Sequence, residues 1–164
     1  MAKVLVIRLS AIGDVAMTVP VIYSAAKANP EDSFTVLTQA FLMPLFMNRP
    51  PNVEVIGINT KGAEKGLIGL LKFISALLKF DFDVILDLHN VIRTIIICTF
   101  FRLNGKRVFV LDKARKERKR LTAIKGKRLY PLRPVIVRYA DVFRAAGLNY
   151  TETFTSLYLS LIHI

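Results

Sequence analysis

The sequence is poor in the residues that build metal centres and disulfide frameworks. Its 164 residues include one cysteine, Cys98, and two histidines, His89 and His163. One cysteine cannot form an internal disulfide, and this set of ligands is too small and too scattered for a zinc site. Cys98 stands among apolar residues, which is typical of a buried, inert thiol rather than a nucleophile. We therefore expect no metal site and a reducing, cytoplasmic environment.

Long hydrophobic runs and glycine-rich phosphate loops are also missing. The most apolar window, 66–80, contains Lys72 and Lys79 and is shorter than the ~20 apolar residues that cross a bilayer. The opening apolar run ends at Arg8, too early for the core of a signal peptide. Neither G-x-G-x-x-G nor G-x-x-x-x-G-K-[ST] occurs. These absences argue against a transmembrane helix, a signal peptide, and a dinucleotide or P-loop triphosphate site.

Acidic residues are half as numerous as basic ones, 12 against 24, so the formal charge is +12. Ten of the basic residues lie between Lys113 and Arg133, where Glu117 is the one acid. Positive charge concentrated in one segment favours an anionic partner, such as nucleic acid, anionic lipid headgroups or a phosphorylated small molecule. A solvated basic loop is the plain structural alternative. The remaining composition, 53% hydrophobic, indicates one globular domain with a core of its own.

Apolar residues alternate between the short runs of buried strands and the three-to-four spacing of helices. Strands are expected at 4–9, 34–38, 53–58, 82–88 and 107–111, and helices at 15–28, 41–47, 66–78, 91–103 and 134–146. Pro20 predicts a kink or a late start in the first helix. Residues 154–159 are either a last strand or the start of a linker. This alternation predicts an α/β fold, a doubly wound parallel sheet with helices on both faces.

In such a sheet all strand-to-helix loops open on one edge, where ligands bind. We expect this edge to carry residues 10–14, residues 89–93 and part of the basic segment. Asp14 is either the N-cap of the first helix or a general base acting on a ligand. His89 is either a polar group of the site or a hydrogen-bonded structural histidine. Arg138, on the last helix, faces either solvent or this edge.

Three motifs resemble, in their order and spacing, the amino-terminal half of the family 9 glycosyltransferases, the ADP-heptose:lipopolysaccharide heptosyltransferases. They are Ile7-Arg-Leu-Ser-Ala-Ile-Gly-Asp-Val-Ala-Met-Thr-Val-Pro20, Asp83-Val-Ile-Leu-Asp-Leu-His-Asn-Val-Ile-Arg-Thr94 and Val137-Arg-Tyr-Ala-Asp-Val-Phe143. The resemblance implies the GT-B fold, in which two Rossmann-like domains face each other across a cleft. Residues 1–158 are then the acceptor-binding domain, and the carboxyl-terminal nucleotide-sugar domain, which holds ADP-heptose, is absent from this chain.

The resemblance also implies an inverting transfer of heptose from ADP-heptose to the lipopolysaccharide inner core, without a metal or other cofactor. Asp14 matches the family's catalytic base, which takes the proton from the acceptor hydroxyl as its oxygen attacks the anomeric carbon. Arg115 and Arg138 match basic positions that hold the anionic acceptor, whose Kdo carboxylates and lipid A phosphates suit guanidinium groups. The residues expected to bind substrate are Arg8, Ser10, Gly13, His89, Arg93, Arg115 and Arg138.

The implied location is peripheral, at the cytoplasmic face of the inner membrane, with no nucleic-acid partner. The chain departs from the family pattern at Pro134, at Val137 and at 88–90, where Leu-His-Asn replaces the commoner small-Gln-Gly. These departures leave open a different acceptor or donor sugar. An alternative from another class is a basic nucleic-acid-binding module that uses Lys113–Arg133, although aromatic residues do not interleave with this segment. A stand-alone nucleotide-binding domain is disfavoured by the missing glycine loop.

The last six residues, 159–164, carry a separate signal. Leu-Ser-Leu-Ile-His-Ile is the translation of CTG TCT CTT ATA CAC ATC, a common transposase sequencing adapter. We therefore expect this tail to be non-native and the gene to be truncated before its second domain. A fragment of this kind would lack the donor site and would be inactive alone. A native gene that ends after Ile164 would refute this expectation.

Overall fold

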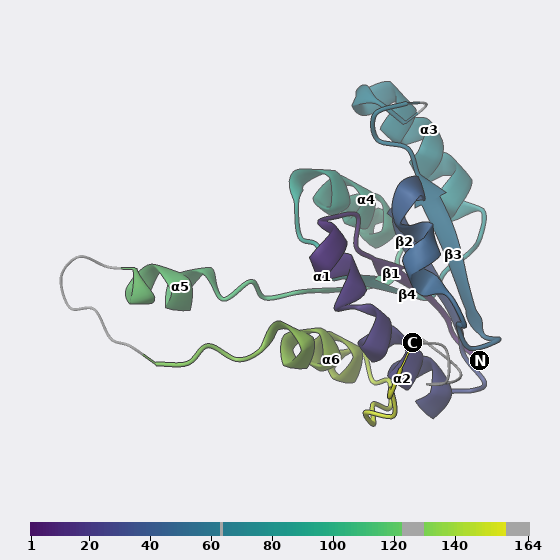
Figure 1. The fold of residues 1–164 in the computed structure, drawn as a ribbon. Helices are drawn as coiled ribbons and strands as arrows, with labels where there is room; N and C mark the ends of the chain where they lie inside the picture. The colour runs from purple at the N-terminus through teal and green to yellow at the C-terminus, as the bar shows by residue number, and fades with distance from the viewer. Residues whose placement is uncertain (63, 123–129, 157–164) are drawn as a thin grey trace.

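The computed structural model describes residues 1–62, 64–122 and 130–156; the tail at 159–164 lies outside them. A five-stranded parallel sheet forms the centre of the molecule, with the strand order β3-β2-β1-β4-β5 (Figure 1). The strands are β1 (Lys3–Ile7), β2 (Ser33–Gln39), β3 (Val53–Ile58), β4 (Val84–Asp87) and β5 (Arg107–Val110). The order reverses at β1, which pairs with both β2 and β4. Such a reversal creates a crevice at the carboxyl ends of the strands.

Helices cover both faces of this sheet. They are α1 (Ile12–Ala16), α2 (Val19–Ala28), the 3-10 helix η1 (Ala40–Phe46), α3 (Gly66–Leu78), α4 (Ile92–Leu103), α5 (Arg115–Leu121) and α6 (Val135–Ala145). Side chains from α1, α2, η1 and α6 pack on one face, and side chains from α3 and α4 pack on the other. α5 projects away from the sheet, and none of its residues is buried (Figure 1). None of the helices within the described ranges is long and apolar enough to cross a membrane.

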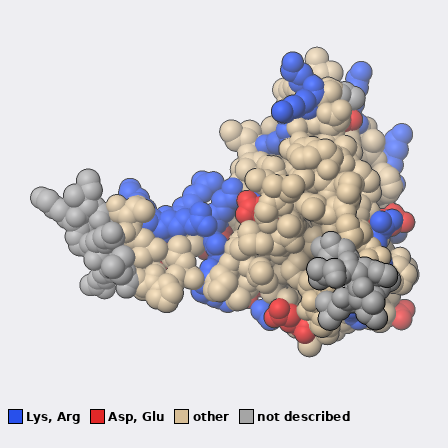
Figure 2. Space-filling view, viewed as in Figure 1, with Lys and Arg blue, Asp and Glu red and all other residues tan. Residues whose placement is uncertain are grey.

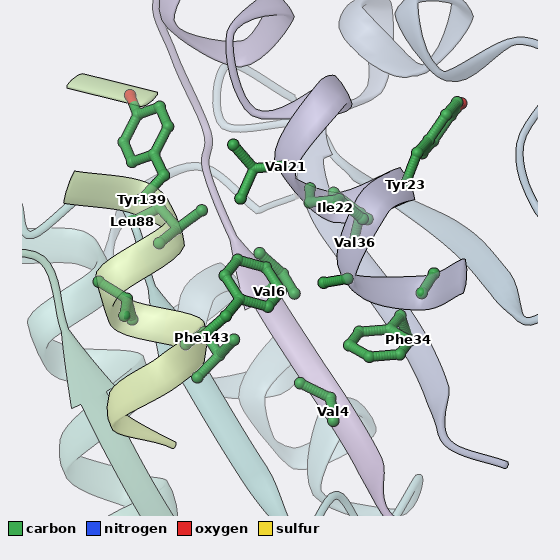
Figure 3. Packing of buried hydrophobic residues seen from close by; sticks show 14 of the residues in the cluster. Val4, Val6, Val21, Ile22, Tyr23, Phe34, Val36, Leu88, Tyr139 and Phe143 are labelled. Carbon is green, nitrogen blue, oxygen red and sulfur yellow. The ribbon is translucent and has the colours of Figure 1, made fainter. Parts of the chain in front are cut away.

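The two cores meet at β1, whose side chains alternate between the faces of the sheet. Val4 and Val6 belong to the core under α2 and α6, and Leu5 and Ile7 belong to the core under α3 and α4. In the first core the ring of Phe143 on α6 stacks on Phe34 of β2, with the ring centres 6.5 Å apart (Figure 3). This packing ties α6, near the end of the described chain, to the strands at its beginning.

The doubly wound parallel sheet expected from the sequence pattern is confirmed, and the local differences have physical causes. The helix expected at 15–28 is two helices, because a proline ring at position 20 would clash with the carbonyl of residue 16 in a continuous helix. Pro20 instead occupies the second position of α2, where a missing N–H costs little. The helix expected at 41–47 is 3-10, and residues 154–156 are not a strand. Within the basic segment, α5 is helical and residues 123–129 lie outside the described residues.

Candidate active site

Arg8 occupies the centre of the carboxyl edge, directly after β1. Its backbone N–H donates to the carbonyl of Leu37 at 3.0 Å, which continues the pairing with β2. Nη1 donates to the carbonyl of Leu88, after β4, at 2.6 Å, and Nη2 forms an ion pair with Oδ2 of Asp14. The guanidinium carbon lies 5.9 Å from the ring centre of Tyr139 on α6. Arg8 is therefore a buried cation, 6% exposed, that joins four elements.

Asp14 is the third residue of α1 rather than its N-cap. The N-cap is Ala11, and no side chain caps this helix. The helix-cap interpretation is therefore wrong, because α1 begins at Ile12, three residues earlier than the pattern predicts. The carboxylate is bound by Arg8 and remains 41% exposed. It is thus fixed in direction and still accessible to a ligand.

The loop after β4 is shaped by a buried carboxylate. Asp87 is fully buried, and its Oδ1 accepts hydrogen bonds from the N–H groups of His89 at 2.9 Å and Asn90 at 2.8 Å. Its Oδ2 faces the Sγ of Cys98 at 3.8 Å. Burial raises the pKa of the Cys98 thiol to about 12, so the inert thiol predicted from the sequence fits this position. Asp87 therefore holds the turn that directs His89 and the carbonyl of Leu88.

His89 faces Ser10 across the edge, with 3.4 Å between Nε2 and Oγ. Burial, assisted by the Arg8 cation, lowers the pKa of His89 from its ordinary value of 6.5 to about 4. The imidazole is consequently neutral at physiological pH, and it can donate or accept a hydrogen bond without adding charge. His89 Nδ1 has no hydrogen-bond partner among the described residues, so no carboxylate orients His89 as a base that would make Ser10 a nucleophile.

These groups line one cavity of about 370 Å³ at the carboxyl edge of the sheet. Its walls are formed by Arg8, Ser10, Ala11, Asp14, His89, Leu111, Lys113, Arg118, Val135, Arg138 and Tyr139. The structure thus brings together five of the eight predicted site residues: Arg8, Ser10, Asp14, His89 and Arg138. Arg138 is oriented by its own hydrogen bond, from Nη1 to the carbonyl of Asp112 at 3.3 Å.

The other three predicted residues lie outside this cavity. Gly13 is exposed in α1, next to Asp14, and has open space where a side chain would be. Arg93 and Arg115 line a second groove, at the start of α4. Arg93 donates there to the carbonyl of Glu64 at 3.2 Å. Arg93 and Arg115 therefore do not line the cavity that contains Asp14.

Sequence reasoning missed three polar residues of the cavity wall, Lys113, Arg118 and Tyr139. Lys113 and Arg118 belong to the basic segment, where no apolar period indicated which cations turn inward. Tyr139 has the spacing and aromatic character of a core residue, and it is fully buried, although it also lies under Arg8. The available signals were its place in the third motif, 137–143, and its adjacency to Arg138.

The cavity is strongly cationic. Arg8, Lys113, Arg118 and Arg138 stand against the single carboxylate of Asp14, a net charge of +3. Burial, with the nearby Arg115 and Arg8, lowers the pKa of Lys113. Figure 2 shows further Lys and Arg side chains on the arm that carries α5. Across the described ranges, no group of three or more His, Cys, Asp or Glu side chains could hold a metal. An anionic ligand with a hydroxyl close to Asp14 suits this arrangement best.

Unsatisfied polar atoms gather around the same cavity. In the part of the chain that the structure describes, five buried side-chain nitrogen or oxygen atoms have no hydrogen-bond partner. Four belong to residues of the cavity wall: Arg8 Nε, His89 Nδ1, Arg138 Nε and Tyr139 Oη. Buried polar groups are normally hydrogen-bonded, and exceptions concentrate where a site serves a function. This clustering marks the cavity as the candidate site.

No family model matches the chain, and no curated protein matches it in sequence. Solved structures do match. The glycosyl transferase family 9 protein from Veillonella parvula aligns with a TM-score of 0.65 at 21% identity, covering 90% of this chain and 42% of that protein. E. coli heptosyltransferase WaaC, solved with ADP-2-deoxy-2-fluoro heptose, aligns at 0.61 and 21% identity, covering 94% and 50%. E. coli ADP-heptose LPS heptosyltransferase II aligns at 0.59 and 21% identity, covering 97% and 47%.

The fold is that of one half of a family 9 heptosyltransferase. This chain spans about half the length of each matched structure, which corresponds to one domain of the two-domain GT-B fold. The resemblance inferred from the three motifs is thereby confirmed at the level of the fold. At 21% identity the likeness extends to the course of the backbone and assigns no role to a side chain.

Proposed function

We propose that this chain is the acceptor-binding, amino-terminal domain of an inverting glycosyltransferase that transfers heptose from ADP-heptose to the lipopolysaccharide inner core. One observation supports it above the others. A single accessible carboxylate, Asp14, stands in a cavity of four cations at the carboxyl edge of a heptosyltransferase-like domain. A base beside a cluster of cations suits a sugar that carries both a reactive hydroxyl and negative charge.

In the proposed reaction, Asp14 is the general base. Arg8 binds Oδ2, and no other group among the described residues binds the carboxylate, so Oδ1 is available to an acceptor hydroxyl. The hydroxyl proton moves to Asp14 as its oxygen attacks the anomeric carbon of ADP-heptose. The bond from that carbon to the phosphate oxygen of ADP breaks on the opposite face, which inverts the configuration. Neutral His89 can hydrogen-bond the acceptor and align it.

The cations of the cavity are proposed to hold the acidic groups of the acceptor. Arg118 and Arg138 can each present two N–H groups to a carboxylate or phosphate, as the Kdo and lipid A groups of the acceptor would require. Hydrogen bonds to charged groups contribute roughly 1.5–3 kcal/mol, or about 10- to 100-fold in affinity. We therefore expect Arg138→Gln to weaken binding of a soluble Kdo-lipid A acceptor by about that factor.

Calorimetry on this chain measures that effect without a donor. Arg144→Gln is the matched control, since Arg144 lies on the same helix but pairs with Asp141 and stacks on Tyr150, outside the cavity. If Arg138→Gln and the control bind the acceptor with equal affinity, Arg138 does not contribute to the acceptor site. Salt-sensitive binding of RNA or DNA in preference to the acceptor would favour the nucleic-acid-binding alternative.

The catalytic role is tested in the protein that contains this domain together with a nucleotide-sugar domain. Asp14→Asn removes the base and nearly preserves the shape of the side chain. General-base catalysis contributes roughly 10²- to 10⁴-fold, so turnover should fall within that range while acceptor affinity is retained. Unchanged turnover would remove Asp14 as the base.

A membrane surface is the further partner we propose, because the acceptor is a glycolipid. Leu67 and Ile68 on α3 and Ile92 on α4 are 60%, 74% and 79% exposed. The hydrogen bond from Arg93 to Glu64 brings the starts of these two helices together. Three exposed lysines lie near the start of α3 in the sequence: Lys61, Lys65 and Lys72. Figure 2 shows Lys and Arg side chains gathered at the end of the molecule where Figure 1 places the start of α3. Apolar side chains among cations suit an anionic bilayer surface.

Co-sedimentation with vesicles tests this surface. We expect binding to vesicles of equal parts phosphatidylglycerol and phosphatidylcholine, and loss of most of that binding in Ile68→Ser. Phe80→Ser is the matched control, since Phe80 is 50% exposed but follows the other end of α3. Loss of binding in both variants, or in neither, would show that the start of α3 is not the contact.

A further inference from the structure

Tyr139 is the buried residue that connects α6 to the candidate base Asp14, through its contact with Arg8. It lies on α6, 125 residues after Asp14 in the chain, and is fully buried. Figure 3 shows its ring beside Leu88, with the hydroxyl at the outer end of the core. Burial raises the pKa of Tyr139, so its ring stays neutral around physiological pH. A neutral aromatic ring beneath a guanidinium attracts it through a cation–π interaction, which is strongest where water is excluded.

The Arg8 guanidinium is held on three sides. The ring of Tyr139 lies 5.9 Å from its carbon, the Leu88 carbonyl accepts from Nη1 at 2.6 Å, and Asp14 accepts from Nη2. A guanidinium is planar, so hydrogen bonds from both of its Nη atoms, together with the nearby ring, restrict its rotation. The direction of the Nη2–H bond is then set by Leu88 and Tyr139. Asp14, half-exposed and on a five-residue helix, takes its orientation from that bond.

We propose that Tyr139 and Arg8 are positioning residues for Asp14, which they hold in the one orientation that meets an acceptor hydroxyl. This inference rests on the proposed role of Asp14 as base. The packing of α6 then affects catalysis, because the ring of Tyr139 supports Arg8 and Arg8 orients the Asp14 carboxylate. The hydroxyl of Tyr139 has no part in this role.

Two substitutions of Tyr139 separate the ring from the hydroxyl. Tyr139→Phe keeps the ring and its cation–π contact with Arg8, so the kcat of the two-domain protein should stay about 10-fold or more above that of Tyr139→Leu. Tyr139→Leu removes the ring and frees Arg8. A misplacement of about 1 Å costs roughly 10²-fold in rate, so kcat should fall about 10- to 100-fold with little change in the KM for ADP-heptose.

Phe143→Leu is the control for a merely structural role. Phe143 is also fully buried on α6, one turn further along, but its ring stacks on Phe34 and not on Arg8. Both leucine variants should lower the melting temperature, and only Tyr139→Leu should lower kcat at a temperature where all variants are folded. Within this chain alone, the Arg8 Nε–H proton should exchange slowly with solvent in the wild type and in Tyr139→Phe, and quickly in Tyr139→Leu.

Three results would overturn the inference. The first is a Tyr139→Leu variant with the wild-type kcat. The second is an equal loss of kcat in Tyr139→Leu and Phe143→Leu. Either result would leave the proposed function intact. A wild-type two-domain protein that transfers no heptose would overturn the proposed function and this inference together.

Discussion

The turn after β4 provides the sharpest test of how the site is built, through the substitution Asp87→Ala. One oxygen of this fully buried carboxylate accepts the N–H groups of His89 and Asn90, at 2.9 and 2.8 Å. Alanine leaves both donors unsatisfied in a partly buried loop. A buried donor that loses its partner costs about 1–3 kcal/mol, so the free energy of unfolding should fall by about 3 kcal/mol. For a chain of this size that lowers the melting temperature by roughly 6–12 °C.

Asp87→Asn isolates the cause of that loss. The amide carbonyl can occupy the position of Oδ1 and keep both hydrogen bonds, so its stability should lie within about 1 kcal/mol of the wild type. Asp83→Ala is the surface control, because Asp83 accepts a hydrogen bond from Lys3 in an exposed position. Surface substitutions of this kind change stability by about 0.5 kcal/mol or less.

Urea unfolding followed by circular dichroism measures all three variants. Acceptor affinity should fall in Asp87→Ala as well, because the same turn supplies His89 to the cavity and the Leu88 carbonyl to Arg8. Wild-type stability in Asp87→Ala would refute the reasoning. So would an Asp87→Asn variant as unstable as Asp87→Ala, since the charge rather than the two hydrogen bonds would then hold the turn.

Three further predictions concern glycine packing, histidine protonation and thiol reactivity. Gly57→Ala should lower the free energy of unfolding by about 1–3 kcal/mol, because its Cβ would lie 2.8 Å from the Cα of Ala40. Gly13→Ala, in open space within α1, should not lower the melting temperature, because alanine favours a helix more than glycine does. His89 binds a proton more readily unfolded (ordinary pKa 6.5) than folded (about 4), so stability should fall between pH 6.5 and 4, and less in His89→Gln by urea unfolding. Cys98 should resist iodoacetamide at pH 8 until urea unfolds the chain; rapid labelling of the native protein by mass spectrometry would contradict its burial.

Elements with a clear apolar pattern could be predicted closely from the sequence. β3 and α3 have the bounds expected, 53–58 and 66–78. The buried residues of α3, Leu70, Ile74 and Leu77, recur at helical spacing, and β3 is a short, mostly apolar run that begins shortly after two prolines. α5 could not be predicted in this way, since it buries no side chain and so has no apolar period to detect. The division of α1 from α2 follows from Pro20. The sequence predicted that this proline would interrupt the helix, but not where each of the two helices would begin and end.

The candidate site was predictable in part for a similar reason. Asp14, His89 and Ser10 follow the carboxyl ends of strands, and a parallel sheet places all such positions on one edge. Whether a cation of the basic segment turns toward that edge depends on the path of the chain after β5, which local pattern does not encode. Lys113 and Arg118 were therefore found in the cavity by the structure, and Arg115 was found beside it.

The sequence by itself determined the class of fold and the edge at which the chemistry lies. Both follow from short-range sequence patterns. Strand and helix periods repeat within a few residues, and in a parallel sheet every loop that follows a strand lies at the same edge. Only the tertiary structure decided that Arg8 binds Asp14, that the Leu88 carbonyl and Tyr139 surround Arg8, and that four cations share one cavity. Those contacts join residues up to 131 positions apart, and the close packing of helices on a twisted sheet, rather than any short pattern, brings them together.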